Sequence, residues 1–170
     1  MIKRGKAGAE LEVGNSLFLA ESVDGYILDH ELKREKSPGD SRWLQERYEG
    51  LKEKCNPQLY GLAADRGFAS KAFTKKLEED NVYDSICPRD AKKLAKRLEE
   101  DEIFYDNLVR RAQTEGRIGI LKNVFLGGTP LSKGFKNRQR QVAWAVLSHN
   151  LWVLARQKWR EEPDAVVKAA

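Results

Sequence analysis

The sequence predicts a mixed α/β domain in which a β-hairpin leads into short parallel strands that alternate with helices. An Asp-Gly pair, Asp24-Gly25, stands between two segments whose apolar residues alternate, which is typical of a two-stranded antiparallel hairpin. Further along, two short apolar segments bounded by turn residues lie between segments with helical periodicity. The 170 residues, 41% hydrophobic and 34% charged, are enough for the core of one globular domain.

The elements follow from the periodicity and from the residues that interrupt it. Asp40 follows Ser-Pro-Gly as a good N-cap, Asn56-Pro57 ends the helix that Asp40 begins, and Pro88 ends the second short strand. We expect a hairpin within Leu11–Lys33, a helix from Asp40 to about Cys55, a strand Leu59–Asp65, a helix after Ser70 to about Glu79, a strand Val82–Cys87, helical structure from Asp90 to Val124, and a last helix from Lys136 to about Glu161. The strand Leu59–Asp65 is apolar throughout, so we expect it to be buried on both faces.

These elements define one domain over residues 11–162, with a flexible lead-in at 1–10 and a flexible tail at 163–170. No apolar run is long enough to span a bilayer and no signal core follows the basic N-terminus, so we expect a cytoplasmic protein without a membrane partner. The two cysteines are isolated in the sequence and have no CxxC spacing, which argues against a zinc site.

The charge is unevenly distributed. The net charge is 31 − 26 = +5, and no acidic residue occurs from Gly116 to Arg160. That segment contains nine basic residues: Arg117, Lys122, Lys133, Lys136, Arg138, Arg140, Arg156, Lys158 and Arg160. A stretch of one sign suits a polyanion such as nucleic acid, although a solvated basic helix face is an equal interpretation of the charge alone.

Two segments could carry chemistry. Asp65 ends the strand of "LYGLAADRGF", where α/β sheets commonly bind ligands, although an aspartate there also suits a simple turn. In the second segment, a helical stripe brings Arg111, Glu115 and Lys122 to one face. The alternative is an Arg111–Glu115 ion pair at the edge of the packed face, a common feature that contributes little.

Two carboxylates of this kind can hold divalent cations against a phosphodiester. Mg²⁺, or Mn²⁺, prefers carboxylate and water oxygens, and a pair of such ions stabilises the attacking and leaving oxygens of an in-line displacement. Arg111 and Lys122 are candidates to hold the nucleic-acid backbone. A further basic set could extend the DNA track: Lys133, Lys136, Arg138 and Arg140.

The sequence resembles the C-terminal catalytic part of DDE-type transposases of bacterial insertion sequences. The motifs that carry the resemblance are "GKAGAELEVGNSLFLAESVDGYILDHEL", "AADRGFAS", "RRAQTEGRIGILKN" and "VAWAVLSHNLWVLARQ". Arg111, Glu115 and Lys122 match the spacing of the family's Y-x2-R-x3-E-x6-K signature, with Leu108 in place of the tyrosine. The resemblance implies a ribonuclease-H-like fold, with Asp65 as the second catalytic aspartate and Glu115 as the closing glutamate.

The first catalytic aspartate of that family lies on a strand before the hairpin, and this chain has no aspartate there. We therefore expect the fold to lack its first strand, which a homodimer partner or another chain could supply. The resemblance implies DNA transposition by metal-dependent cleavage and strand transfer. The alternative is an inactive remnant that only binds DNA or assembles, while a ribonuclease-H-like nuclease or resolvase does not explain the Arg111–Glu115–Lys122 spacing.

Overall fold

The computed structural model describes residues 15–35, 38–55, 59–127 and 133–161, so the predicted lead-in and tail lie outside the described residues. The chain is a mixed α/β protein with two small sheets. It divides into two compact units, Met1–Phe18 with Lys33–Gln113, and Leu19–Leu32 with Thr114–Ala170. Among the described residues, no helix has an apolar stretch long enough to cross a membrane.

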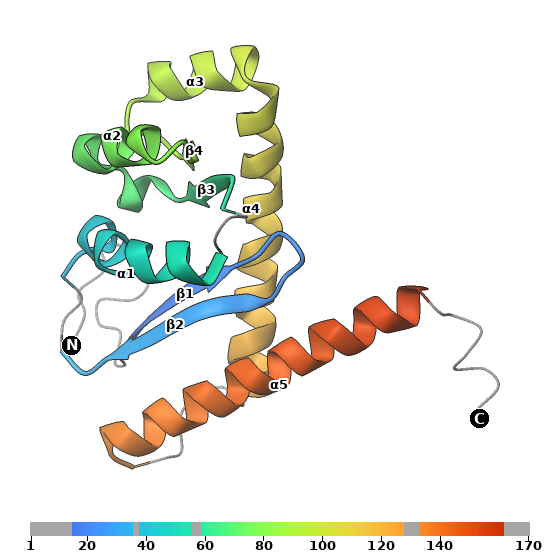
Figure 1. The fold of residues 1–170 in the computed structure, drawn as a ribbon. Helices are drawn as coiled ribbons and strands as arrows, with labels where there is room; N and C mark the ends of the chain where they lie inside the picture. The colour runs from blue at the N-terminus through green and yellow to red at the C-terminus, as the bar shows by residue number, and fades with distance from the viewer. Residues whose placement is uncertain (1–14, 36–37, 56–58, 128–132, 162–170) are drawn as a thin grey trace, which may run out of the picture. The chain divides into compact units, whose positions relative to one another are not determined.

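The predicted hairpin is present as β1 (Ser16–Glu21) and β2 (Ile27–Lys33), drawn in blue in Figure 1. The turn is closed by two backbone hydrogen bonds, from the Ser22 N–H to Tyr26 O at 2.8 Å and from the Gly25 N–H to Ser22 O at 3.0 Å. Gly25 has φ +94°, a conformation that L side chains rarely adopt. The Asp-Gly signal is therefore confirmed, and so short a connection makes the pair antiparallel. The part of the expected hairpin before Asn15 lies outside the described residues.

The first unit contains a parallel pair, β3 (Gly61–Ala64) and β4 (Tyr83–Ile86), in which Gly61 lies opposite Tyr83 and Ala64 opposite Ile86. Between them in sequence is α2 (Lys71–Glu79), which lies beside β4 (Figure 1). The expectation that the first strand is buried on both faces is wrong, because Gly61 and Ala63 are exposed. Within the described residues β3 pairs only with β4, so no strand pairs with its other edge.

The core of the first unit forms between α1 (Asp40–Cys55), α2 and the start of α4. The rings of Tyr48 and Phe73 meet edge to face with centroids 5.1 Å apart. The helical periodicity of the sequence accounts for these positions, since they recur at three- and four-residue steps. The buried side chains of these three helices are Trp43, Leu44, Tyr48, Leu51, Phe73, Leu77 and Phe104.

The helical segment predicted from Asp90 to Val124 is interrupted at Asp101, where the chain turns from α3 (Ala91–Glu100) into α4 (Glu102–Ile120). Asp101 has φ −131° and ψ 90°, outside the helical region. Its carboxylate accepts hydrogen bonds from the Tyr83 hydroxyl, from the Phe104 N–H at 3.0 Å and from Arg97 Nη2 at 3.2 Å. The break is therefore stabilised by a side chain that caps α4 and ties it to β4.

Asp101 makes the stability of the first unit dependent on pH. The hydrogen bond from Tyr83, followed by those from Phe104 and Arg97, holds the pKa of Asp101 below its ordinary value. The ionised form therefore stabilises the fold above the unfolded-state pKa of about 4, and this contribution is lost as the pH falls through the lower folded-state pKa. We expect Asp101→Asn to lower the free energy of unfolding by about 1.5–3 kcal/mol at neutral pH. Urea titrations between about pH 6 and pH 3 should show a steeper loss for the natural chain than for the variant.

The matched control is Asp106→Asn, an exposed position in the first turns of α4 that undergoes the same change of charge. Its unfolding curve should follow that of the natural chain. Parallel pH profiles for the natural chain and Asp101→Asn would show that the Asp101 hydrogen bonds do not favour the ionised carboxylate.

The second unit contains most of the hairpin, the end of α4, a five-residue π-helical segment η2 (Leu121–Phe125) and α5 (Phe135–Glu161). Asn150 fastens α5 to β2, because its side-chain oxygen accepts the Ile27 N–H at 2.9 Å and its amide donates to Ile27 O at 3.0 Å. The neighbouring His149 is buried against the rings of Phe125 and Trp152. The last predicted helix is thus confirmed, and an amide side chain takes the place of a neighbouring strand at Ile27.

Candidate metal and nucleic-acid site

Asp65 follows β3 directly and caps the short 3-10 helix η1 (Arg66–Phe68). Its Oδ1 accepts the Arg66 N–H at 2.7 Å, and 58% of its side chain is exposed. The turn interpretation of this aspartate is therefore confirmed. An exposed carboxylate at a strand end can also face a ligand, so the turn does not exclude a second role.

Arg111, on α4, forms an ion pair with this carboxylate, with 3.0 Å between Arg111 Nη1 and Asp65 Oδ1. The contact lies within the first unit and joins the end of β3 to the helix that carries the second motif. The pair is too exposed to stabilise the fold by more than about 1 kcal/mol. The ion pair places a guanidinium, a group that binds phosphate oxygens, next to a carboxylate, a group that binds cations.

Glu115 and Lys122 belong to the second unit. Glu115 is exposed on the same unbroken helix as Arg111, four residues later, as the sequence predicts. Lys122 is exposed in η2, where the Leu126 N–H bonds to Leu121 O at 2.9 Å, a bond that spans five residues. The helix that carries the predicted stripe therefore changes from α to π at its C-terminal end, where a turn contains more residues.

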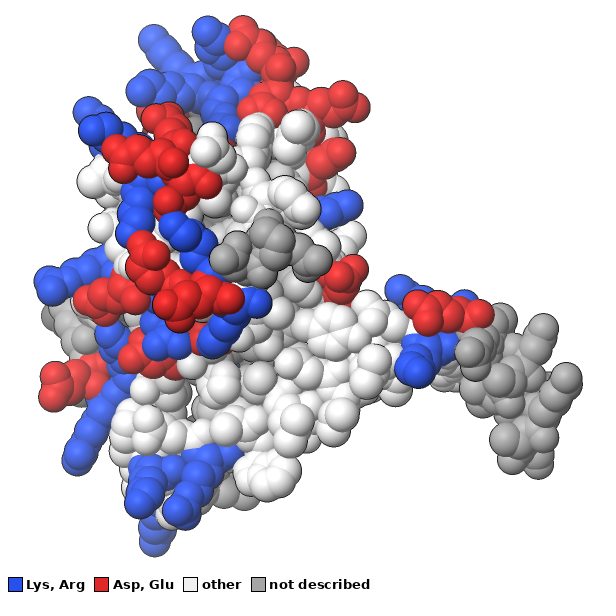
Figure 2. Space-filling view, viewed as in Figure 1, with Lys and Arg blue, Asp and Glu red and all other residues white. Residues whose placement is uncertain are grey.

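The predicted DNA-contacting residues beyond Lys122 cluster just before and within the first turns of α5. Lys133, Lys136 and Arg140 are exposed, and Arg138 is half-buried. Figure 2 shows Lys and Arg side chains gathered at this end of α5. Closely spaced exposed cations of this kind can contact successive phosphates of a nucleic-acid backbone.

The donor set limits the kind of metal site. Within the described ranges, no three or more His, Cys, Asp and Glu side chains lie together in a group that could hold a metal ion. Asp65 and Glu115 provide two exposed carboxylates. Mg²⁺ is commonly held by one or two carboxylates, with waters and substrate phosphates completing its shell. An exposed carboxylate of this kind suits a cation that arrives with nucleic acid, and the described residues provide no closed protein cage.

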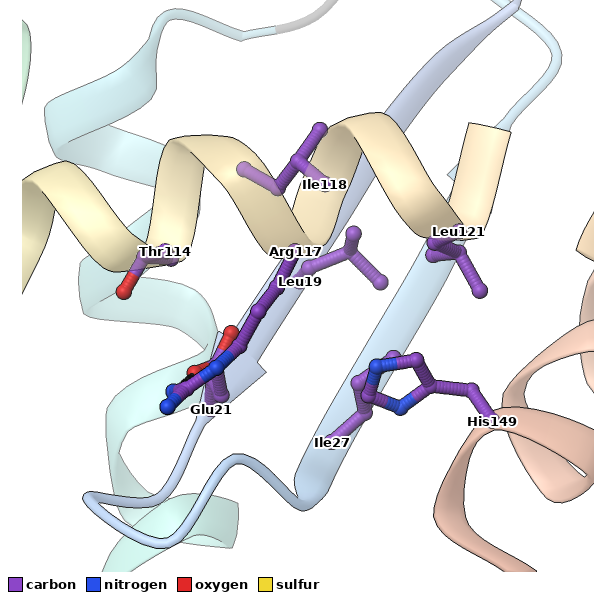
Figure 3. A pocket seen from close by; sticks show the side chains of 8 residues that line it. All are labelled: Leu19, Glu21, Ile27, Thr114, Arg117, Ile118, Leu121 and His149. Carbon is purple, nitrogen blue, oxygen red and sulfur yellow. Dashed lines mark hydrogen bonds and ion pairs between the residues drawn. The ribbon is translucent and has the colours of Figure 1, made fainter. Parts of the chain in front are cut away.

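A separate small cavity in the second unit, lined mainly by apolar groups, was not anticipated from the sequence. It has a volume of about 30 Å³, enough for about one water, and is lined by Leu19, Glu21, Ile27, Thr114, Arg117, Ile118, Leu121 and His149. Figure 3 shows the Arg117 side chain lying alongside Glu21, with which it forms an ion pair. Glu21 is only 10% exposed. One feature of the sequence points to this ion pair. No acidic residue occurs from Gly116 to Arg160, so a carboxylate that pairs with Arg117 comes from another part of the chain.

Arg117 also explains a second requirement at the hairpin turn. A Cβ added to Gly25 would lie 3.1 Å from Arg117 Cζ, a closer approach than ordinary van der Waals contact. A larger residue there would require the Arg117 guanidinium to shift by a few tenths of an ångström, while the positive φ by itself favours glycine.

Other polar and aromatic residues have definite positions in the second unit. His149 and Asn150 form a structural pair, with 3.4 Å between His149 Nδ1 and Asn150 Oδ1. Asp29 is buried at 4% exposure on the same face of β2 as Ile27. Trp144 and Trp159 are exposed.

Comparison of the chain with protein-family models, with curated proteins and with solved structures gave no match. The function is therefore argued from the residues and their geometry.

Proposed function

We propose that this chain is part of a DDE-type transposase that cleaves DNA and transfers the cut strand in a metal-dependent reaction. The observation that carries the proposal is the Asp65–Arg111 ion pair. It supports the interpretation because the charged residues that begin the two motifs, Asp65 of "ADRGF" and Arg111 of R-x3-E-x6-K, are 46 positions apart in the sequence and yet form this contact.

Each residue has a role in this proposal. Asp65 and Glu115 would hold Mg²⁺ or Mn²⁺, while Arg111 and Lys122 would bind the phosphodiester. The bound ion supplies a Lewis acid and lowers the pKa of a water that attacks phosphorus. The basic start of α5 would bind the flanking DNA backbone, so that the scissile phosphate is positioned before the reaction.

The two separate sheets support a ribonuclease-H-like origin of the fold. In the described residues β1 pairs with β2 and β3 with β4, and the two sheets share no strand. This is the arrangement expected when a central strand is missing from a continuous sheet. We propose that a strand of a second copy or of another chain adds to the open edge of β3, where backbone N–H and C=O groups can accept it.

The alternative function is a remnant that binds DNA without cutting it. The observation that favours this alternative is the donor set, because the described residues bring no third carboxylate to the two that the proposal uses. Such a protein would keep the electrostatic attraction of α5 for phosphates and would lose the metal-dependent chemistry.

The test is a cleavage assay with a supercoiled plasmid, in which the full chain is incubated with Mg²⁺, Mn²⁺ or EDTA. We expect metal-dependent nicking that falls by at least about tenfold in Glu115→Gln, because one oxygen ligand loses its charge. The matched control is Glu99→Gln, which removes the same charge from an exposed position on α3.

Each outcome separates the two candidates. Equal nicking by Glu115→Gln and the natural chain would remove Glu115 from the mechanism. Salt-sensitive DNA binding that is unchanged by EDTA, without nicking, would establish the remnant and overturn the enzyme. Absence of both binding and nicking would overturn the two candidates together.

A further inference from the structure

The helix α5 carries two apolar stripes, and only one of them is covered. The inner stripe packs within the second unit and consists of Val142, Ala145, Val146, His149 and Val153. The outer stripe is exposed, with exposures from 43% to 67%, and consists of Trp144, Leu147, Leu151 and Leu154. Large apolar side chains gathered on one exposed face are typical of an interaction site.

The spacing of the outer stripe identifies the kind of element that fits it. Its members follow one another by three, four and three residues, which is the repeat of a coiled-coil seam and not of a surface helix with scattered apolar residues. A seam of this spacing is complementary to another helix lying nearly parallel or antiparallel to α5.

A hollow on this face has the geometry of a coiled-coil hole. It has a volume of about 210 Å³ and is lined by Arg140, Ala143, Trp144 and Leu147. These positions are i, i+3, i+4 and i+7, the four that surround each inserted side chain in knobs-into-holes packing. Ala143 is the smallest of the four lining residues, so a larger residue at this position would reduce the space. A hollow with this lining can accept an apolar side chain of a partner helix.

The charges around the stripe select the partner. Lys136 and Arg140 precede the apolar residues on the same face, and Lys158 follows them. Figure 2 shows an uncharged surface along the middle of α5, with Lys and Arg side chains at its start and both basic and acidic side chains at its end. A second α5 would set Lys136 and Arg140 against the same cations or against a last turn whose one carboxylate, Glu161, is outnumbered by Lys158 and Arg160, which is unfavourable. A helix with carboxylates at both ends would pair with these cations in either orientation.

We propose that the outer face of α5 docks an amphipathic helix of a partner protein that has an aliphatic seam in three-four spacing and acidic residues at both ends. One aliphatic side chain of that helix occupies the hole over Ala143, and its neighbouring carboxylate lies against Arg140. The docking face shares Lys136 and Arg140 with the proposed DNA track, but it uses none of the residues assigned to metal binding, so its test does not depend on the cleavage reaction.

The probe for the test is a synthetic helical peptide of about 21 residues, three heptads, with leucines in the seam and glutamates at both ends. Fluorescence anisotropy should show binding to the full chain, and a peptide with lysines at both ends should bind at least about tenfold more weakly. Ala143→Phe fills the hole without changing charge and should weaken binding of the acidic peptide by at least about tenfold. Gln139→Ala, exposed on the same helix beside the seam, is the matched control and should leave binding unchanged.

A charge exchange gives the most specific result. Arg140→Glu should weaken the acidic peptide, and a peptide with lysines only at the end that meets position 140 should restore the lost affinity. Circular dichroism melts establish that each variant is folded, which is expected because the substituted residues are exposed. Equal binding of acidic and basic peptides, or no binding of either, would overturn the proposal. A dimer of the chain or binding to anionic phospholipid vesicles that Ala143→Phe abolishes would also overturn it in favour of those occupants.

Discussion

Phe104→Ala is expected to lower the free energy of unfolding of the first unit by about 3–5 kcal/mol. The Phe104 side chain is fully buried, and the Arg97 guanidinium lies over its ring with Cζ 4.1 Å from the centroid. The same guanidinium donates a hydrogen bond to Asp84 O at 2.8 Å. The cation that stacks on the Phe104 ring therefore also connects α3 to β4. Truncation would leave a cavity and remove the cation–π contact together.

The measurement is urea denaturation at neutral pH, read by circular dichroism. Tyr105→Ala is the matched control, since this neighbouring ring is 52% exposed and its loss should change stability by no more than about 0.5 kcal/mol. A shift of the midpoint with an unchanged slope would mean that only stability changed. Similar midpoints for the two variants would show that Phe104 is not part of the core.

The double variant Lys133→Ala/Lys136→Ala is expected to weaken DNA binding by tens of fold at about 0.1 M salt. Each lysine that neutralises a phosphate contributes about 0.9 to the slope of log affinity against log salt, so the slope should become shallower by about 1.8. Both side chains are exposed near the start of α5. The measurement is fluorescence anisotropy of a labelled duplex over a series of salt concentrations.

The control removes the same net charge from elsewhere in the chain. Lys71 and Lys75 are exposed on α2, and the double variant Lys71→Ala/Lys75→Ala should leave the salt slope near that of the natural chain. If the two double variants lose affinity equally, the attraction comes from net charge and α5 provides no specific backbone track.

The elements with strong local signals were predicted correctly from the sequence. The helix Asp40–Cys55 has the predicted bounds, and the Asp24-Gly25 turn connects the predicted strands. Both depend on interactions between neighbours in the chain, namely helical periodicity and the conformational freedom of glycine. Interactions between residues close in the chain can be predicted from the sequence. The predicted N-cap is wrong by one residue, because Gly39 O accepts the first helical hydrogen bond, from the Trp43 N–H at 3.0 Å, and Asp40 is already helical.

The break between α3 and α4 at Asp101 could not be predicted in this way. The segment Asp90–Val124 has helical periodicity throughout, and α3 and α4 are both helices. The interruption depends on Tyr83 of β4, whose hydroxyl donates a hydrogen bond to the Asp101 carboxylate. The periodicity of residues 90–124 cannot indicate this contact, because Tyr83 lies outside that segment.

For the candidate site, the two motifs, their spacing and the excess of basic residues after Gly116 can be read from the sequence. Three features could be seen only in the fold: Asp65 both caps a turn and binds Arg111, Lys122 lies in a π turn, and one apolar face of α5 is exposed. Pairing and burial depend on which distant segments meet, whereas helix and turn formation depend mainly on residues close in sequence.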